Sequence, residues 1–271
     1  MRSHSAKSGS APLGMALANL RVGVKVRAHV AQSDKKGYRY FMKIHGLQKM
    51  TLLDFPGKVA CTVFLGGCDF ACPFCHNADL LDMSAPAVME DDELLRFLEG
   101  RKGLLEGVAF TGGEPLMRKD LGELMAKIRE MGFAIKLDTN GNRPEALRDL
   151  VERGLVDYVA MDVKNSPGRY AETVGFETFD TGKVDESIRY LLEGHVPYKF
   201  RTTVVAQFHD EDSFKAIADW ITGADFYALQ GFVDRETVPF AGLSACTKEE
   251  MEHFADIVRP HVKKVELRGI D

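Results

Sequence analysis

Three cysteines in one short stretch of the chain have the type and spacing of metal ligands. Cys68, Cys72 and Cys75 stand in Gly-Cys-Asp-Phe-Ala-Cys-Pro-Phe-Cys-His-Asn, with the spacing C-x3-C-x2-C. Three thiolates this close can bind three irons of a [4Fe–4S] cluster and leave the fourth iron without a protein ligand. An iron with an open position can bind a substrate, as open catalytic metals do. No fourth cysteine is near, since Cys61 precedes the stretch and Cys246 lies far downstream.

The same spacing is open to two other interpretations. The three cysteines together with His76 could form a structural zinc site. They could also be buried free thiols with no metal. Spacing alone does not separate the cluster from zinc. Polar motifs elsewhere in the chain favour the cluster, because each of them follows a stretch that we expect to be a strand.

A glycine-rich motif, Thr111-Gly112-Gly113-Glu114-Pro115, follows the apolar run at residues 107–110. Two adjacent glycines allow a ligand to approach the backbone closely. An ordinary strand-to-helix turn, with Pro115 opening the helix, would have the same composition. Because the cysteine stretch lies in the same chain, we favour the ligand-binding interpretation.

Charged residues end two further predicted strands. The motif Asp138-Thr139-Asn140-Gly141 closes residues 133–138, and Asp162-Val-Lys164 closes residues 158–163. A carboxylate at the end of an apolar strand needs a polar partner, which can be a ligand or a neighbouring cation. A structural ion pair of Lys164 with Asp162 or Asp138 is therefore the alternative to a binding role. The Asn-Gly turn is common after strands and carries less information.

Apolar runs alternate with helical patterns from residue 58 onward, which indicates parallel βαβ units. The predicted strands are residues 58–66, 107–110, 133–138, 158–163, 199–205, 225–232 and a short 265–268. The predicted helices are residues 91–98, 121–131, 144–153, 185–192, 212–221 and 248–258. Each polar motif falls at the carboxyl end of a predicted strand, where both barrels and doubly wound sheets bind ligands. The pattern predicts one site in an α/β fold of about six βα units.

Composition narrows the class of protein. The 271 residues are 45% hydrophobic, which suits one large α/β domain or two small ones. A net charge of −5, with 35 basic and 40 acidic residues, gives no support for nucleic-acid binding. The apolar runs are too short to span a bilayer, so we expect no membrane segment. Five cysteines, three of them in a metal-type cluster, predict a reducing cytoplasm rather than a disulfide framework.

Residues 1–41 differ from the rest of the chain. The first 33 residues contain five basic side chains and no acidic one, a composition that overlaps with transit peptides. We prefer the interpretation that Met42 is the true start and that the preceding residues are an over-extended gene prediction. We therefore expect residues 1–41 to be poorly ordered and dispensable, and residues 42–271 to form the functional domain.

The cysteine spacing, with Phe74 directly before the last cysteine, resembles the signature of the radical S-adenosylmethionine (SAM) superfamily. The resemblance implies a partial (β/α)6 TIM-like barrel and a [4Fe–4S] cluster bound by Cys68, Cys72 and Cys75. In that family the open iron binds the amino and carboxylate groups of SAM. One electron then cleaves SAM and yields a 5′-deoxyadenosyl radical.

The resemblance also implies roles for the other motifs. In the family, the segment matching Thr111, Gly112, Gly113 and Glu114 binds the methionine part of SAM. In glycyl-radical-enzyme activases, segments matching Asp138, Thr139, Asn140, Asp162 and Lys164 lie around SAM. Of these, Asp138, Thr139 and Asp162 would bind a monovalent cation, and Lys164 would contact the ribose or carboxylate. His76 and Asn77 would contact cluster sulfurs or adenosine, and Arg201 would contact SAM. Gln230 stands where some activases carry a histidine near the adenine. His195, His209, His253 and His261 have no motif context, and we expect them to be solvated or capping residues.

Residues 46–58 and 162–170 resemble a short subgroup, the anaerobic ribonucleoside-triphosphate reductase activating proteins. That resemblance implies hydrogen abstraction from a glycine of a partner enzyme, anaerobic ribonucleotide reductase, with flavodoxin or ferredoxin as electron donor. A pyruvate formate-lyase activase and a small-molecule enzyme similar to 7-carboxy-7-deazaguanine synthase are the alternatives. The alternative that is not an enzyme is an interaction module held together by zinc. We also expect Gly113→Val to weaken SAM binding and to spare the cluster.

Overall fold

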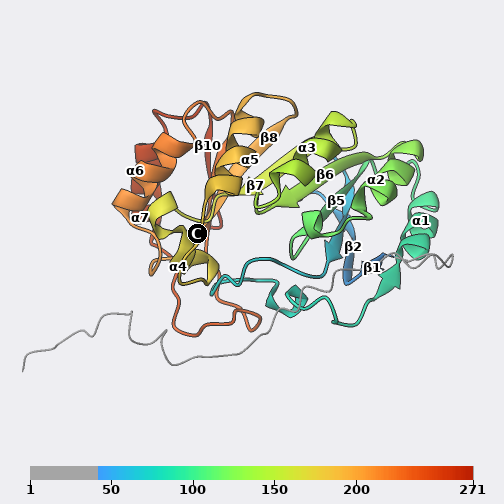
Figure 1. The fold of residues 1–271 in the computed structure, drawn as a ribbon, viewed down its shortest axis with the longest axis horizontal. Coiled ribbons are helices and arrows are strands. Elements are labelled where there is room, and N and C mark those ends of the chain that lie inside the picture. The colour runs from blue at the N-terminus through green and yellow to red at the C-terminus, as the bar shows by residue number, and fades with distance from the viewer. Residues whose placement is uncertain (1–41, 271) are drawn as a thin grey trace, which may run out of the picture. The chain divides into compact units, whose positions relative to one another are not determined.

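The computed structural model describes residues 42–270, which form a mostly parallel eight-stranded sheet with the order β10-β9-β8-β7-β6-β5-β3-β2 (Figure 1). Only β2 runs antiparallel to its neighbour. The strands are β2 Gly46–Thr51, β3 Ala60–Leu65, β5 Gly107–Gly112, β6 Ala134–Thr139, β7 Tyr158–Asp162, β8 Tyr198–Val204, β9 Tyr227–Gly231 and β10 Val265–Arg268. A separate two-stranded sheet pairs β1 Lys43–Ile44 with β4 Met89–Glu90.

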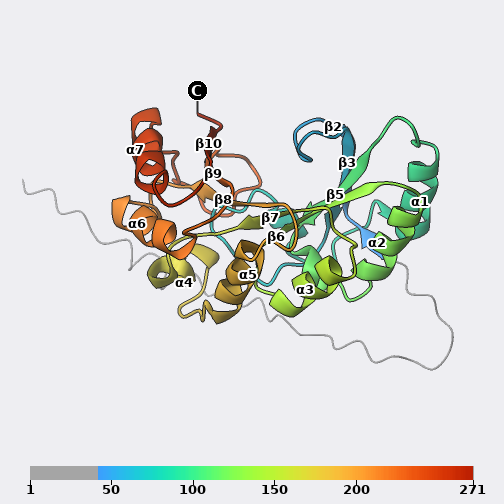
Figure 2. The same cartoon turned by 90° about the horizontal axis from the view of Figure 1, so that it is seen from above.

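Helices follow the parallel strands and cover the convex side of the sheet, which Figure 2 shows as an arc with β2 and β10 at its two ends. They are α1 Asp91–Glu99, α2 Leu121–Glu130, α3 Pro144–Glu152, α4 Tyr170–Val174, α5 Gly182–Leu192, α6 Glu211–Trp220 and α7 Lys248–Val258. Capping boxes begin α1 and α7, and the Asp210 side chain caps α6. These caps satisfy amides that the first turn of a helix leaves unpaired.

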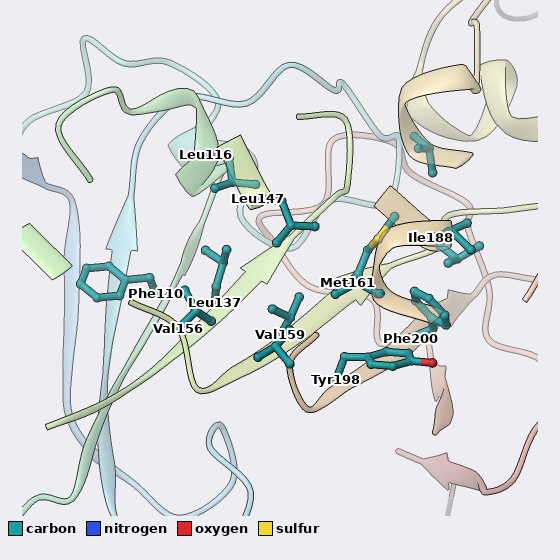
Figure 3. Close-up of a cluster of buried hydrophobic side chains, with 14 of the residues drawn as sticks. Phe110, Leu116, Leu137, Leu147, Val156, Val159, Met161, Ile188, Tyr198 and Phe200 are labelled. Atoms are coloured by element: carbon teal, nitrogen blue, oxygen red, sulfur yellow. The ribbon is translucent and has the colours of Figure 1, made fainter. Parts of the chain in front are cut away.

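The hydrophobic core lies between the sheet and the helices. Leu137, Met161 and Phe200 point from β6, β7 and β8 toward Leu147 of α3 and Ile188 of α5 (Figure 3). Burial of such side chains contributes roughly 1.5–3 kcal/mol each. Because side chains alternate along a strand, the residues between them point to the concave face. That alternation places the charged residues of β6, β7 and β8 inside the arc.

The fold class predicted from the sequence is confirmed, since the sheet is mostly parallel and each predicted strand and helix is present. Four elements were not predicted: the antiparallel strand β2, the paired strands β1 and β4, and the five-residue helix α4. None of the helices within residues 42–270 has the length and apolar content that a membrane span requires. The expectation that residues 1–41 are poorly ordered lies outside the described residues.

Candidate active site

The motifs identified in the sequence meet at the carboxyl ends of the parallel strands. The cysteine loop follows β3, the glycine motif ends β5, and Asp138 and Asp162 end β6 and β7. Since β3, β5, β6 and β7 are neighbours in the sheet, their carboxyl ends lie side by side. This edge is where (β/α) barrels build their active sites.

The cysteine loop is held at several backbone points. Gly67 donates its N–H to Leu80 O at 2.7 Å, Ala71 to Val174 O at 3.0 Å, and Cys75 to Cys72 O at 3.1 Å. The amide of Phe70 lies 3.4 Å from Cys68 Sγ and donates to it. An amide that donates to sulfur stabilises a thiolate. The loop therefore offers its thiols from a fixed backbone.

All three thiols are free; Cys72 is buried, and Cys68 and Cys75 are half-buried. Burial raises the pKa of Cys72 to about 11 and raises the pKa values of Cys68 and Cys75 as well. Because thiolates are the metal-binding form, such buried thiols need a nearby positive charge to ionise. Bound iron would supply that charge, and Lys164 contributes part of it by lowering the pKa of Cys72. The donor set and its surroundings fit a cluster.

Within residues 42–270, no three His, Cys, Asp or Glu side chains are close enough to hold a single metal ion. A cubane cluster binds each thiolate at a different iron. Its three sulfur ligands therefore need not converge on one point.

Asp69, inside the cysteine motif, connects the loop to the segment between β6 and α3. Its carboxylate accepts hydrogen bonds from Asn140 Nδ2 at 2.8 Å and Asn142 Nδ2 at 3.1 Å, and Arg143 Nε lies 3.2 Å away. Asn140 Nδ2 also lies 4.0 Å from Cys68 Sγ. The sequence motifs did not point to Asp69, Asn142 or Arg143. A charged residue between two cysteine ligands was the only available signal.

The glycine motif packs directly on the cysteine loop. Gly113 N–H donates to Leu65 O at 2.8 Å, and Glu114 N–H donates to Gly67 O at 2.7 Å. A Cβ on Gly113 would lie 2.0 Å from Gly67 O, and a Cβ on Gly112 would lie 2.4 Å from Leu65 O. The two glycines thus allow two chain segments to touch. Their predicted contact with SAM stays a prediction, as does that of Thr111 beside them.

Glu114 is fully buried and connects the glycine motif to the end of β6. Its Oε1 accepts from Thr139 Oγ1 at 2.9 Å and from Leu116 N at 3.0 Å, and its Oε2 accepts from Asn140 N at 2.7 Å. Burial raises the pKa of Glu114 to about 7, although these hydrogen bonds oppose the shift. Both oxygens of the carboxyl are thus engaged within the protein.

The two aspartates at the ends of β6 and β7 are bound by cationic side chains. Arg201 on β8 contacts both of them, with Nη1 3.1 Å from Asp138 Oδ2 and Nε against Asp162. Lys164 Nζ lies 2.8 Å from Asp162 Oδ2, and Lys136 contacts Asp138. Burial alone would raise the pKa of Asp162, but Arg201 and Lys164 outweigh it and hold this pKa well below its usual range. The ion pair of Lys164 with Asp162, one of the alternatives from the sequence, is present.

The residues after the last cysteine hold neighbouring loops. His76 Nε2 lies 2.7 Å from Val233 O, and the ring stacks on Phe232. Asn77 Nδ2 donates to Gly112 O at 3.0 Å. Their predicted contacts with cluster sulfurs or adenosine remain predictions.

Two further residues of the predicted site lie near the same loops. Phe74 is buried against Phe208. Gln230, half-buried near the end of β9, stands next to Thr203 of β8. The structure therefore brings Gln230 to the carboxyl end of the sheet, and its predicted contact near the adenine stays a prediction.

His209 was expected to be a solvated or capping residue, and the structure corrects this. It is buried between β8 and α6, where Nδ1 accepts from Val205 N at 3.1 Å and Nε2 lies 2.9 Å from Lys164 O. Since Nδ1 accepts, the proton of the neutral ring is on Nε2, which donates to the carbonyl. Burial lowers the pKa of His209 to about 4. This neutral ring supports the backbone of Lys164 and had no sequence signal.

Comparisons with known proteins agree with this geometry. The profile of the radical SAM superfamily matches residues 62–221, which is more than half of the chain. A protein of Methanocaldococcus jannaschii, provisionally named a glycyl-radical enzyme activating enzyme, is 28% identical over 240 residues, covering 84% of this chain and 96% of that protein. A pyruvate formate-lyase-activating enzyme of Clostridium pasteurianum is 30% identical over 45% of this chain and 52% of its own length.

A solved structure supports the fold. A domain of the pyruvate-formate lyase-activating enzyme of Bacteroides vulgatus matches with a TM-score of 0.50 at 18% identity, covering 60% of this chain and 98% of that chain. At this identity the likeness concerns the fold alone. The superfamily profile spans β3 to α6 and includes the cysteine loop, the glycine motif and both aspartates. The chain belongs to the radical SAM superfamily.

Proposed function

We propose that this protein is a radical SAM activase that generates a glycyl radical on a partner enzyme. The observation that carries the proposal is the similarity to the M. jannaschii protein, which extends over 84% of this chain. It therefore includes the strands and loops around the site as well as the cysteine loop. Superfamily membership alone implies a [4Fe–4S] cluster and SAM and leaves the substrate open.

In this proposal Cys68, Cys72 and Cys75 hold the cluster. The cluster, when bound, supplies the electron that cleaves SAM reductively. The protein's residues bind and orient the reactants and keep water away. Lys164 and Arg201 place positive charge at the strand ends, where the carboxylate of SAM can be bound.

The partner in this proposal is anaerobic ribonucleotide reductase, and the electron donor is flavodoxin or ferredoxin. The support is the resemblance of residues 46–58 and 162–170 to the activating proteins of that reductase. A hydrogen atom would move from the Cα of a glycine in the partner to the 5′ carbon of the deoxyadenosyl radical. The products would be methionine, 5′-deoxyadenosine and a partner that keeps the unpaired electron on its glycine.

A monovalent cation beside Asp138, Thr139 and Asp162 is a further part of the proposal. Both carboxylates are bound by cationic side chains in this structure. Binding of a cation would therefore require Arg201 or Lys136 to release Asp138, since like charges in a buried site repel. We expect Na⁺ or K⁺ to raise the affinity for SAM only if that release occurs.

The proposal is tested by anaerobic reconstitution with iron and sulfide, followed by electron paramagnetic resonance of the reduced protein. We expect a [4Fe–4S]⁺ signal that changes when SAM is added. Mixing with anaerobic ribonucleotide reductase should then give a glycyl radical on the reductase and 5′-deoxyadenosine. An iron-free protein that binds zinc instead would support the interaction module.

The alternative enzymes are separated by the same experiment. A pyruvate formate-lyase activase would place the radical on pyruvate formate-lyase, to which the C. pasteurianum relative is linked by name. A small-molecule radical SAM enzyme, such as one similar to 7-carboxy-7-deazaguanine synthase, would cleave SAM productively without either protein. Assaying the three substrates in parallel with one preparation decides between these enzymes.

A further inference from the structure

The concave face of the sheet is unusually polar for the inside of a barrel. Barrel interiors are normally filled by layers of bulky branched apolar side chains. Here β6 contributes Lys136 and Asp138, β7 ends in Asp162, and β8 contributes Lys199 and Arg201. Their partners on the opposite face, including Leu137, Met161 and Phe200, form the core in Figure 3. The interior of this barrel is therefore suited to binding a polar ligand.

Positive charge exceeds negative charge in this interior. Four cationic side chains and two carboxylates lie together, namely Lys136, Lys164, Lys199 and Arg201 with Asp138 and Asp162. Three of the four cations contact an aspartate. Lys199 has no hydrogen bond or ion pair to any residue between 42 and 270. The excess positive charge is therefore at Lys199.

Lys199 is almost completely buried, with 3% of its surface exposed. Its Nζ lies 6.0 Å from the centroid of the Phe226 ring. Burial, together with Arg268, Arg201 and Lys136, lowers the pKa of Lys199 to about 8, and Asp138 only partly opposes this. The Nζ atom keeps some contact with solvent, since it is not among the fully enclosed polar atoms that lack a partner. Its partial burial without an anion is still unfavourable. A bound anion would remove the cost.

The eight-stranded sheet is not closed into a complete barrel. The strands β2 and β10 end the sheet and do not pair with each other (Figure 2). Arg268 on β10 stands at this edge with 38% of its side chain exposed and binds Glu266 at 2.5 Å. Lys199 lies two residues before Arg201 on the same strand, which is about 7 Å deeper. Because Arg268 is paired with Glu266, Lys199 is the cation on this face that lacks an anionic partner among residues 42–270.

We propose that the barrel interior beside Lys199 is a binding site for a carboxylate of the substrate. A phosphate is less suited, because this level lies toward the amino ends of the parallel strands, where helices end rather than begin. The carboxylate can belong to an acidic side chain of a protein substrate or to a small organic acid. The proposal deepens the proposed function, since it assigns a chemical group to the substrate of the same barrel.

The site is tested with sodium acetate as the probe. Thermal unfolding of the reconstituted protein is followed anaerobically at saturating SAM, so that SAM occupies its own carboxylate site. Acetate replaces chloride at constant ionic strength. We expect the midpoint to rise by several degrees and to saturate, because a ligand of the folded state stabilises it. An unchanged midpoint in the wild-type protein would overturn the proposal.

Two variants identify the residue. Lys199→Met keeps the length of the side chain and removes its charge, and it should abolish the acetate response. Lys183→Met, at an exposed position of α5, is the matched control and should respond as the wild type does. An equal response in Lys199→Met would refute the assignment. If that variant does not fold, Arg268→Gln at the half-exposed rim should show a reduced response, and a full response there would count against the site.

The source of the carboxylate is decided in a second arm, which rests on the proposed function. Glycyl-radical formation on anaerobic ribonucleotide reductase is measured at rising acetate concentration. If acetate inhibits radical formation over the same concentrations at which it raises the unfolding midpoint, the site binds an acidic side chain of the reductase. A radical yield unaffected by acetate assigns it to a free acid. The thermal assay does not require radical chemistry, so failure of the activase function leaves its outcome intact.

Discussion

Single residues in this protein divide into those that could bind iron and those that only pack. Cys61 is fully buried in β3, and burial raises the pKa of its thiol to about 12. It points into the core and is not part of the loop that carries Cys68, Cys72 and Cys75. We expect Cys72→Ala to lose the cluster and SAM cleavage entirely. Cys61→Ala should retain both and lose about 1 kcal/mol of stability; iron per protein and thermal unfolding check this, and iron loss in Cys61→Ala would contradict it.

The burial of His209 should make the free energy of unfolding depend on pH. Its pKa is lowered from 6.5 to about 4 in the folded protein, chiefly by burial. The unfolded chain therefore takes up a proton as pH falls below 6.5, while the folded protein does not until about 4. The free energy of unfolding therefore falls by roughly 3 kcal/mol as pH drops from 6.5 to about 4. Below about pH 4 this histidine changes it no further.

The measurement is the free energy of unfolding as a function of pH in wild type and in His209→Gln. Glu114 contributes a slope of opposite sign, because its raised pKa costs stability as pH rises from 4.5 to about 7. The difference between the two proteins isolates the histidine. His195→Gln, at a half-exposed surface position, is the control and should retain the wild-type profile. Parallel profiles for wild type and His209→Gln would disprove the assignment.

We expect the hydrogen bonds of Asp69 to hold the cysteine loop in its conformation. Its carboxylate is mostly buried and is bound by Asn140, Asn142 and Arg143. Hydrogen bonds to a charged group contribute about 1.5–3 kcal/mol. We expect Asp69→Ala to load less iron and to broaden the electron paramagnetic resonance signal, while Asp180→Ala at the start of α5 leaves both unchanged. Full loading with an unaltered signal would show that the loop does not depend on this network.

At the scale of elements, the sequence indicated the parallel strands because each of them is an apolar run of suitable length. The strand β2 was missed because Gly46–Thr51 has mostly exposed or half-buried side chains and no apolar run. The helix α4 was missed because five residues are too few for a periodic pattern. The strand ends and hence the location of the site were predictable. The partners of Asp69, Glu114 and Arg201 were not, because spacing does not fix which side chains meet across strands.

Contact between Gly113, directly after β5, and the cysteine loop changes one expectation from the sequence. Gly113→Val was expected to spare the cluster, but a Cβ there would lie 2.0 Å from Gly67 O and 3.3 Å from Cys68 N. The backbone of the loop must shift to accept it. We now expect this variant to lose iron and SAM binding together, whereas Gly168→Ala, where a Cβ meets no atom within 4 Å, retains both. Iron content and SAM affinity of the two variants are the measurements, and an iron-loaded Gly113→Val would restore the earlier expectation.

At the scale of the whole molecule, the described body begins with an anchored residue. Met42 is 2% exposed, its carbonyl accepts from Asp91 N at 3.1 Å, and β1 follows it immediately. We propose that residues 1–41 are dispensable, so that a chain starting at Met42 folds and binds its cluster as the full chain does. A chain starting at Gly46 lacks β1 and should unfold at lower temperature. Thermal unfolding and iron content decide, and failure of the Met42 chain to fold would refute the proposal.

The close contact of Gly113 with Gly67 also has a thermodynamic consequence. If the glycine motif binds SAM and the loop after Gly67 binds the cluster, each ligand fixes a backbone on which the other depends. Linkage between two binding sites is reciprocal, so the cluster raises the affinity for SAM by the same factor by which SAM raises that for the cluster. Bound SAM would then stabilise the bound cluster. At limiting SAM, this protein would therefore bind its cluster less tightly, before any catalytic turnover is attempted.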